Sequence, residues 1–109
     1  NTSSSLAFKG FKGNASYGAA KAGIIAFSKS LASELAPKIR VNVIAPGAVD
    51  TNFLFGNNRK IATQNLTNNP MSKLASAEDI IGSILFLSGD ASKYITGQVI
   101  HINGGSLMP

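Results

Sequence analysis

A short apolar run that contains Val41, Val43 and Ile44 lies between two longer stretches with helical periodicity. β-Branched residues favour strands, and Pro46-Gly47 is a turn signal that ends this one. Parallel strands are covered on both faces, so they are continuously apolar rather than alternating. The run therefore indicates an α/β architecture, in which helices pack on a parallel sheet.

The stretch before this strand predicts a helix over residues 16–35. Large apolar residues recur along it at spacings of three and four, and a second face carries only small ones. These two sets are Ile24, Phe27, Leu31 and Leu35, and Ala19, Ala22, Gly23 and Ala26. We predict that Ser16 caps this helix and that Pro37, which cannot donate a backbone hydrogen bond, ends it.

A second helix and a second strand are predicted near the end of the chain. Ser76 and Asp79 have the spacing of a capping box, and the helix should continue to Gly89. After a turn at Gly97, residues 99–102 form a short apolar strand. The order strand, helix, strand is typical of right-handed crossovers between parallel strands.

These elements make a sheet that is too small to stand alone. Residues 1–5 have the character of the last residues of a further strand whose body lies upstream. We therefore expect residues 1–109 to form part of a single domain, the C-terminal part of a doubly wound parallel sheet in three α/β/α layers.

Residues 50–74 are polar and rich in Asn, with Gly56 and Asn69-Pro70 as turn signals. Ala62 and Leu66 suggest a short helix within this segment. Long irregular segments of this kind are often lids over a binding site, so we expect a mobile substrate lid here.

The composition excludes several classes of function. There is no Cys, and the single His101 cannot supply a zinc cluster, so we expect no metal site. The net charge is +5, but the basic residues are scattered and no aromatic platform accompanies them, which argues against a nucleic-acid partner. No apolar run is long enough to span a bilayer, so we expect a soluble, cytoplasmic protein without a membrane partner.

Tyr17 and Lys21 stand at i and i+4 in a run made otherwise of Ala and Gly. On a helix this spacing places both side chains on one face. Tyrosine ordinarily titrates near pH 10, so use as a base near neutrality requires about 4 kcal/mol in favour of the phenolate. One cation about 4 Å away in a partly screened site supplies about that much. The pair is therefore suited to proton transfer.

Four motifs in fixed order resemble the short-chain dehydrogenase/reductase family. They are Asn-Thr-Ser-Ser at residues 1–4, Tyr-Gly-Ala-Ala-Lys at 17–21, the segment 39–51 that contains Pro46-Gly47, and the segment 95–105 that ends in Gly-Gly. Ser4 lies thirteen residues before Tyr17, the spacing usual in that family. The resemblance implies a Rossmann-type fold, and it implies that the glycine-rich, nucleotide-binding half of the family's domain is absent from these residues.

The resemblance also implies roles for individual residues. Ser4 would hydrogen-bond the substrate oxygen, Tyr17 would exchange a proton with it, and Lys21 would support the phenolate and hold the nicotinamide ribose. Hydride would come from NAD or NADP, with the choice between them not readable here.

The turn after the first strand is the other part of the expected cofactor site. Ligands of open α/β sheets bind beyond the carboxyl ends of the strands, where Pro46-Gly47 brings the backbone close. By resemblance, the Val49 backbone would meet the nicotinamide carboxamide, and Thr51 would lie beside it or the phosphates.

Several assignments remain open at this point. Ser3 or Ser5 could replace Ser4 as the reacting hydroxyl. Asn14 and Phe53 are candidates for the substrate pocket, although Phe53 has the alternative of ordinary packing. His101 is expected to be structural. Asn103 stands where the family commonly has Asp, which puts only a local hydrogen bond in question.

We therefore expect an NAD(P)-dependent oxidoreductase that interconverts a carbonyl and a secondary alcohol, with a small-molecule substrate; a substrate carried by an acyl carrier is one candidate. The alternatives are a non-catalytic, nucleotide-binding relative that acts as a sensor or assembly subunit, and a fragment that is inactive by itself. Family members are commonly tetramers or dimers, so we expect a homo-oligomer.

Overall fold

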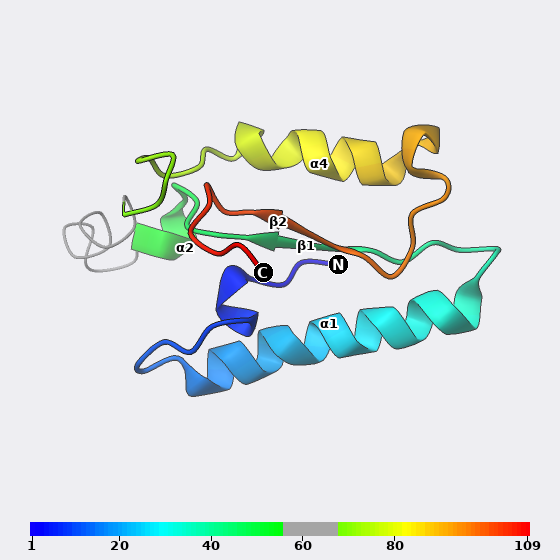
Figure 1. Ribbon diagram of the computed structural model, residues 1–109, viewed down its shortest axis with the longest axis horizontal. Helices are drawn as coiled ribbons and strands as arrows, with labels where there is room; N and C mark the ends of the chain where they lie inside the picture. The colour runs from blue at the N-terminus through cyan, green and yellow to red at the C-terminus, as the bar shows by residue number, and fades with distance from the viewer. Residues whose placement is uncertain (56–67) are drawn as a thin grey trace.

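The computed structural model describes residues 1–55 and 68–109, and it has three layers (Figure 1). Helix α1 (Ala15–Leu35) lies on one side of strands β1 (Val43–Pro46) and β2 (Val99–Ile102), and helix α4 (Glu78–Ser88) lies on the other. The predicted α/β/α arrangement is confirmed. Within the described residues, no helix is both long and apolar enough to cross a membrane.

The sheet is parallel, and β1 lies at its centre. On one side β1 pairs with β2. On the other side Thr2 forms a parallel bridge with Ile44, where the Ser3 N–H donates to the Ile44 carbonyl at 2.8 Å and the Ile44 N–H donates to the Asn1 carbonyl at 3.0 Å. Residues 1–3 thus extend the sheet, a shorter stretch than the predicted 1–5, because a short 3₁₀ helix, η1 (Ser5–Ala7), begins at Ser5.

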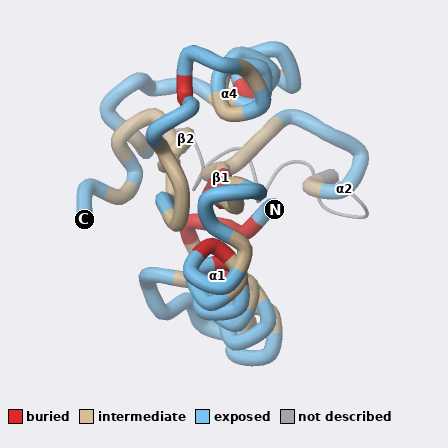
Figure 2. Tube along the Cα trace, turned by 90° about the vertical axis from the view of Figure 1, so that its right-hand side faces the viewer, coloured by how far each residue is buried: buried red, intermediate tan, exposed pale blue. Residues whose placement is uncertain are grey.

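The buried apolar residues come from all three layers and meet around β1 (Figure 2). They are Val43, Ile44 and Ala45 of β1, Ile25 and Ala32 of α1, and Ile80 of α4. A strand that is buried on both faces explains why its sequence is apolar without alternation.

Strand β1 begins two residues later than predicted. Before it, the Val41 carbonyl accepts a backbone bond from the Gly97 N–H at 2.7 Å. Side chains make the other bonds there: the Val41 N–H donates to the Thr96 hydroxyl at 3.0 Å, and the Asn42 amide donates to the Ile95 carbonyl at 2.9 Å. Regular strand pairing starts at Val43, whose N–H donates to the Gln98 carbonyl at 2.9 Å.

Helix α1 begins at Ala15, so the prediction that Ser16 caps it is wrong. Asn14 occupies the cap position and makes no side-chain capping bond. Ala15 has high helix propensity and extends the helix by one residue, so Ser16 lies within the first turn and not before it. Its end is as predicted: Leu35 is the last residue, two before Pro37.

The capping box of α4 is confirmed in its hydrogen bonds. The Ser76 N–H donates to the Asp79 carboxylate at 2.8 Å, and the Asp79 N–H donates to the Ser76 hydroxyl at 3.3 Å. The Lys73 ammonium lies 3.6 Å from the same carboxylate. The bonds from Ser76 and the charge of Lys73 hold the pKa of Asp79 below its ordinary value. At the other end Gly89 follows the helix in an extended conformation, and a second 3₁₀ helix, η2 (Asp90–Ser92), comes next.

The ends of the polar segment 50–74 are held together. Val49 forms a parallel bridge with Ala75, and the Asp50 N–H donates to the Ala75 carbonyl at 2.8 Å. The segment begins with a single turn of helix, α2 (Asn52–Phe55). Ala62 and Leu66 lie outside the described residues, and the lid remains a prediction.

Candidate active site

Tyr17 and Lys21 lie one turn apart on α1, and both are half-buried. The Lys21 ammonium lies 5.7 Å from the centroid of the Tyr17 ring. That separation is within the range of a cation–π contact and keeps the positive charge beside the phenol.

Thr2 and Ser3, at the edge of the sheet, are bonded to the same turn of α1. The Lys21 ammonium donates to the Thr2 carbonyl at 3.3 Å, and the Ser3 hydroxyl donates to the Lys21 carbonyl at 2.7 Å. The bonds to β1 are made by the Asn1 carbonyl and the Ser3 N–H on either side of Thr2. The Thr2 carbonyl therefore points away from β1 and is available to Lys21.

Ser4 is buried and caps η1, where its Oγ accepts a hydrogen bond from the Leu6 N–H at 3.2 Å. That bond uses a lone pair and leaves the hydroxyl proton able to donate elsewhere. Ser3 differs, because its proton is already donated to Lys21. The hydroxyl chemistry therefore favours Ser4 over Ser3 as the group that donates to a substrate, while Ser5 lies buried inside η1.

Helix η1 packs on the first half of α1 (Figure 1). At Gly18 a Cβ would lie 3.4 Å from the Leu6 carbonyl oxygen, an ordinary contact distance, so the two segments are close neighbours. The segment that carries Ser4 thus lies against the turn that carries Tyr17.

The turn after β1 packs closely on the residues at the end of β2. The Gly47 N–H donates to the Ile102 carbonyl at 2.9 Å, and a Cβ on Gly47 would lie only 3.0 Å from the Asn103 Cα. Because the bridge to Ala75 uses the backbone of residues 48 and 50, the Val49 N–H and C=O point to the opposite side. Thr51 is exposed and donates to the Val49 carbonyl at 3.5 Å.

The two residues proposed for the substrate pocket are placed differently. Asn14 is half-buried and lines a surface pocket of about 420 Å³ between the loop of residues 6–11 and α1. Phe53 is 84% exposed on α2.

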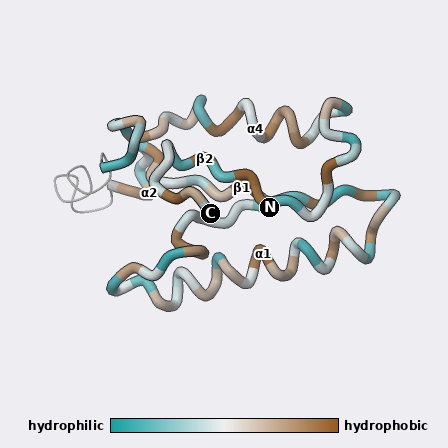
Figure 3. Tube along the Cα trace, viewed as in Figure 1, coloured by the Kyte–Doolittle hydropathy of each residue, from teal (hydrophilic) through white to brown (hydrophobic). Residues whose placement is uncertain are grey.

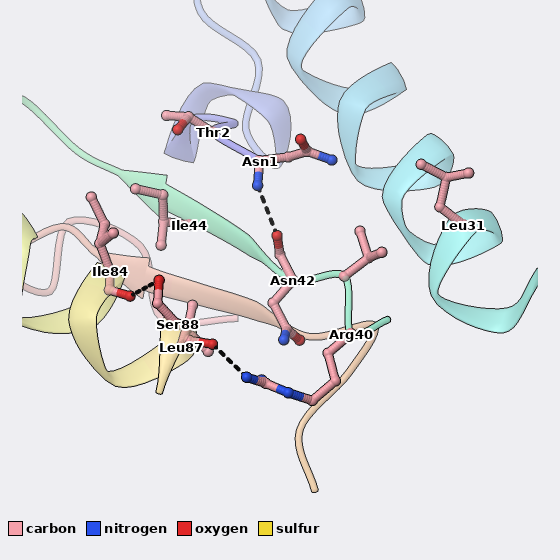
Figure 4. A pocket seen from close by; sticks show the side chains of 10 residues that line it. Asn1, Thr2, Leu31, Arg40, Asn42, Ile44, Ile84, Leu87 and Ser88 are labelled. Atoms are coloured by element: carbon pink, nitrogen blue, oxygen red, sulfur yellow. Dashed lines mark hydrogen bonds between the residues drawn. The ribbon is translucent and has the colours of Figure 1, made fainter. Parts of the chain in front are cut away.

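A second surface pocket of about 450 Å³ lies between α1 and α4 (Figure 4). Its apolar lining comes from both helices and β1, with Leu31, Ile44, Ile84 and Leu87, and Asn1 and Arg40 form its polar part. Neither pocket is lined by Ser4, Tyr17 or Lys21.

His101 and Asn103 have local structural contacts. The His101 ring meets the Phe8 ring edge-on, with centroids 4.7 Å apart. The Asn103 side chain accepts from the Gly105 N–H at 2.9 Å and donates to the Leu107 carbonyl at 2.9 Å. An Asp could make the first bond but not the second.

No group of three or more His, Cys, Asp or Glu side chains that could hold a metal ion occurs in the part of the chain that the structure describes. The side chains of Ser4, Tyr17 and Lys21 themselves offer hydroxyl groups and an amine.

Known proteins resemble this chain along nearly its whole length. The family model described as enoyl-(acyl carrier protein) reductase matches residues 1–106. The 3-oxoacyl-[acyl-carrier-protein] reductase FabG of Buchnera aphidicola subsp. Baizongia pistaciae is 46% identical over 105 residues, which are 95% of this chain and 43% of that protein. FabG of Chlamydia trachomatis serovar D is 44% identical over 106 residues, 96% of this chain and 43% of that protein.

Solved structures share the fold. A short-chain dehydrogenase/reductase (glucose/ribitol dehydrogenase) from Brucella melitensis superposes with a TM-score of 0.91 at 33% identity, over 99% of this chain and 44% of that one. A 3-oxoacyl-[acyl-carrier protein] reductase from Brucella melitensis ATCC 23457 has a TM-score of 0.87 at 34% identity, over 100% of this chain and 41% of that one. The chain thus spans less than half the length of the proteins it matches. Sequence and fold together show that it belongs to the short-chain dehydrogenase/reductase family.

Proposed function

We propose that these 109 residues provide the proton-transfer half of an NAD(P)-dependent oxidoreductase that interconverts a carbonyl and a secondary alcohol. The observation that carries the proposal is the contact between Lys21 and Tyr17, with the ammonium 5.7 Å from the phenol ring and tied to the strand end that leads into Ser4. The similarity to 3-oxoacyl-[acyl-carrier-protein] reductases supports the same reaction class.

In the reduction direction, the Tyr17 hydroxyl gives its proton to the substrate oxygen, and the positive charge of Lys21 stabilises the phenolate that remains. The Ser4 hydroxyl donates a hydrogen bond to the same oxygen as negative charge develops on it. In the oxidation direction the phenolate takes the proton back from the alcohol.

The residues after β1 suit a nicotinamide cofactor. No side chain fits at position 47 next to Asn103, so bare backbone is available there for a flat ligand to approach. The Val49 backbone groups face away from Ala75. Val49 would hold the carboxamide, Thr51 would lie beside it, and Lys21 would hold the ribose. When bound, the reduced nicotinamide supplies the hydride that goes to the carbonyl carbon.

The test uses the natural polypeptide that carries these residues. Oxidation of NADH and of NADPH is followed with a panel of carbonyl substrates that includes a 3-oxoacyl thioester. Tyr17→Phe should lower turnover by at least about a hundredfold with the fold preserved, because it removes the proton donor. Tyr94→Phe is the matched control, since Tyr94 is fully exposed on the loop before β2.

Unchanged turnover in Tyr17→Phe would remove Tyr17 from the mechanism. Dinucleotide binding without turnover on any member of the panel would instead favour the non-catalytic alternative.

We also propose a 3-oxoacyl group on an acyl carrier as the substrate, on the strength of the two named relatives. The same assay tests this with the free acid, the small thioester and the carrier-bound thioester. A clear preference for the carrier-bound form is expected, and equal rates for all three would contradict it.

The oligomeric state is a further part of the proposal. Along α1, small side chains such as Ala22 and Ala26 lie at exposed positions beside the larger, 59% exposed Phe27. Helix α4 exposes Ile81 and Leu85. Figure 3 shows that hydrophobic residues occur along both helices. Both helices suit close packing of a second copy. Ala22→Arg should shift the mass measured by light scattering toward the monomer, while Lys38→Ala should leave it unchanged.

A further inference from the structure

The first three residues are bonded to α1 at two points along the helix. At one point the Ser3 hydroxyl donates to the Lys21 carbonyl at 2.7 Å, and Ser3 is only 3% exposed. At the other, the Asn1 amide donates to the Ser28 hydroxyl at 2.8 Å. Ser28 is 1% exposed and donates in turn to the Ile24 carbonyl at 2.6 Å.

These bonds fix α1 against sliding along the sheet. Residues 1 and 3 of an extended segment point to the same side. Their partners at Lys21 and Ser28 are two turns apart, about 10 Å along the helix axis. Two bonds separated by that distance define both the axial position and the rotation of the helix relative to residues 1–3.

The hydrogen bond from the Ser3 hydroxyl is the one nearest the candidate active site. Its acceptor, the Lys21 carbonyl, belongs to the helix and has a second lone pair for this bond. Ser4 follows in the chain, so the Ser3 bond fixes how the Ser4 segment lies against the turn that carries Tyr17 and Lys21. The Lys21 ammonium is held from the same segment through the Thr2 carbonyl at 3.3 Å.

We infer that Ser3 is a positioning residue: its buried hydroxyl holds the Lys21 turn of α1 in register with Ser4. The inference rests on the proposed function. Ser3 itself does not touch the substrate, because its proton is donated to Lys21. Its effect on the reaction arises because displacements of about 1 Å at a reacting group can reduce turnover by about a hundredfold.

The first experiment compares two serines that make the same type of bond. Ser3→Ala, in the natural polypeptide that carries these residues, should lower kcat by about tenfold to a hundredfold with little change in the KM of the carbonyl substrate. Ser30→Ala is the matched control, because the Ser30 hydroxyl also donates to a carbonyl of α1, that of Ala26 at 3.2 Å, but on the exposed face. Ser30→Ala should have wild-type kinetics, and Ser3→Thr, which keeps the hydroxyl, should recover most of the turnover.

The second experiment tests whether Ser3 acts through Ser4, because the carbonyl that accepts the Ser3 bond belongs to the main chain of residue 21. In a double-mutant cycle, Ser3→Ala should cause no further loss of turnover when Ser4 is already replaced by Ala. Independent, multiplicative losses would overturn the inference, and so would wild-type kcat in a folded Ser3→Ala protein.

If Ser3→Ala does not fold, Ser3→Cys keeps a side chain of similar size but replaces the hydroxyl by a weak donor, and a loss of kcat in the same direction is expected. Wild-type kinetics in that variant would again overturn the inference. The result is separable from the proposed function: an active Tyr17→Phe protein removes the mechanism, whereas an inactive Tyr17→Phe protein with fully active Ser3→Ala removes only the role of Ser3.

Discussion

The Arg40 guanidinium donates a hydrogen bond to the Leu87 carbonyl at 2.9 Å, and so joins the residues before β1 to the last turn of α4 (Figure 4). The same side chain donates to the Ser92 hydroxyl at 3.0 Å and to the Ile95 carbonyl at 3.3 Å. A cation at this position neutralises the partial negative charge at the carboxyl end of the helix. One side chain thereby ties α4 to the sheet at a helix end where Gly89 is extended rather than left-handed.

Arg40→Ala should lower the free energy of unfolding by about 1.5–3 kcal/mol, since several carbonyls lose a charged donor. Arg40→Lys should retain part of the lost stability, because a lysine ammonium carries the same charge but lacks the planar guanidinium that donates to several acceptors at once. Thermal unfolding followed by circular dichroism measures both. Lys38→Ala, at an exposed position on the same connection, should change stability by less than about 0.5 kcal/mol. Equal stability of the Arg40 and Lys38 variants would show that these bonds contribute nothing.

Gly47→Ala should destabilise the turn after β1 by about 1–3 kcal/mol, because the added Cβ would lie 3.0 Å from Asn103 and force the two backbones apart. Chemical denaturation provides the measurement. The comparison is Gly82→Ala in α4, where nothing lies within 4 Å of the added Cβ. That change should stabilise the helix by about 0.8–1 kcal/mol. Unchanged stability of Gly47→Ala would mean that the turn can move away from Asn103.

Asn103→Asp should lower stability by about 1 kcal/mol. The bond from the Gly105 N–H is kept, but the donor to the Leu107 carbonyl at 2.9 Å is replaced by a second acceptor. Asn103→Ala loses both bonds and should be less stable still. The order wild type, Asp, Ala in melting temperature is the expected result, and an Asp variant as stable as the wild type would contradict the account of the Leu107 bond.

Asp79→Asn should destabilise the protein near neutral pH but not in strong acid. The Ser76 N–H and hydroxyl, with Lys73, lower the pKa of Asp79 in the folded state. A lowered folded pKa means that the stabilisation is fully present above the unfolded value and is lost as pH falls through the folded one. Melting temperatures of the two proteins should therefore differ at pH 7 and converge below the ordinary Asp range. A difference that persists unchanged in acid would assign the effect to something other than the carboxylate.

Much of the fold follows from local sequence. Three features are recognisable in the sequence because residues close together in the chain make them: the apolar run around Val43, the residues of β2 and the Ser76–Asp79 capping box. The predicted cap at Ser16 was wrong because Ala15, a strong helix former, extends the helix past it. The start of β1 was misplaced because the side chains of Asn42 and Thr96 make bonds to segments distant in sequence and interrupt the regular ladder there.

The candidate site divides in the same way. Spacing along one helix determined that Tyr17 and Lys21 share a face, since helical periodicity alone requires it. Only the tertiary structure decided that the Ser3 hydroxyl is donated to Lys21 while that of Ser4 keeps its proton available, and that Arg40 closes the end of α4. Those contacts join segments far apart in the chain, so they depend on how helices pack on the sheet and not on any local pattern.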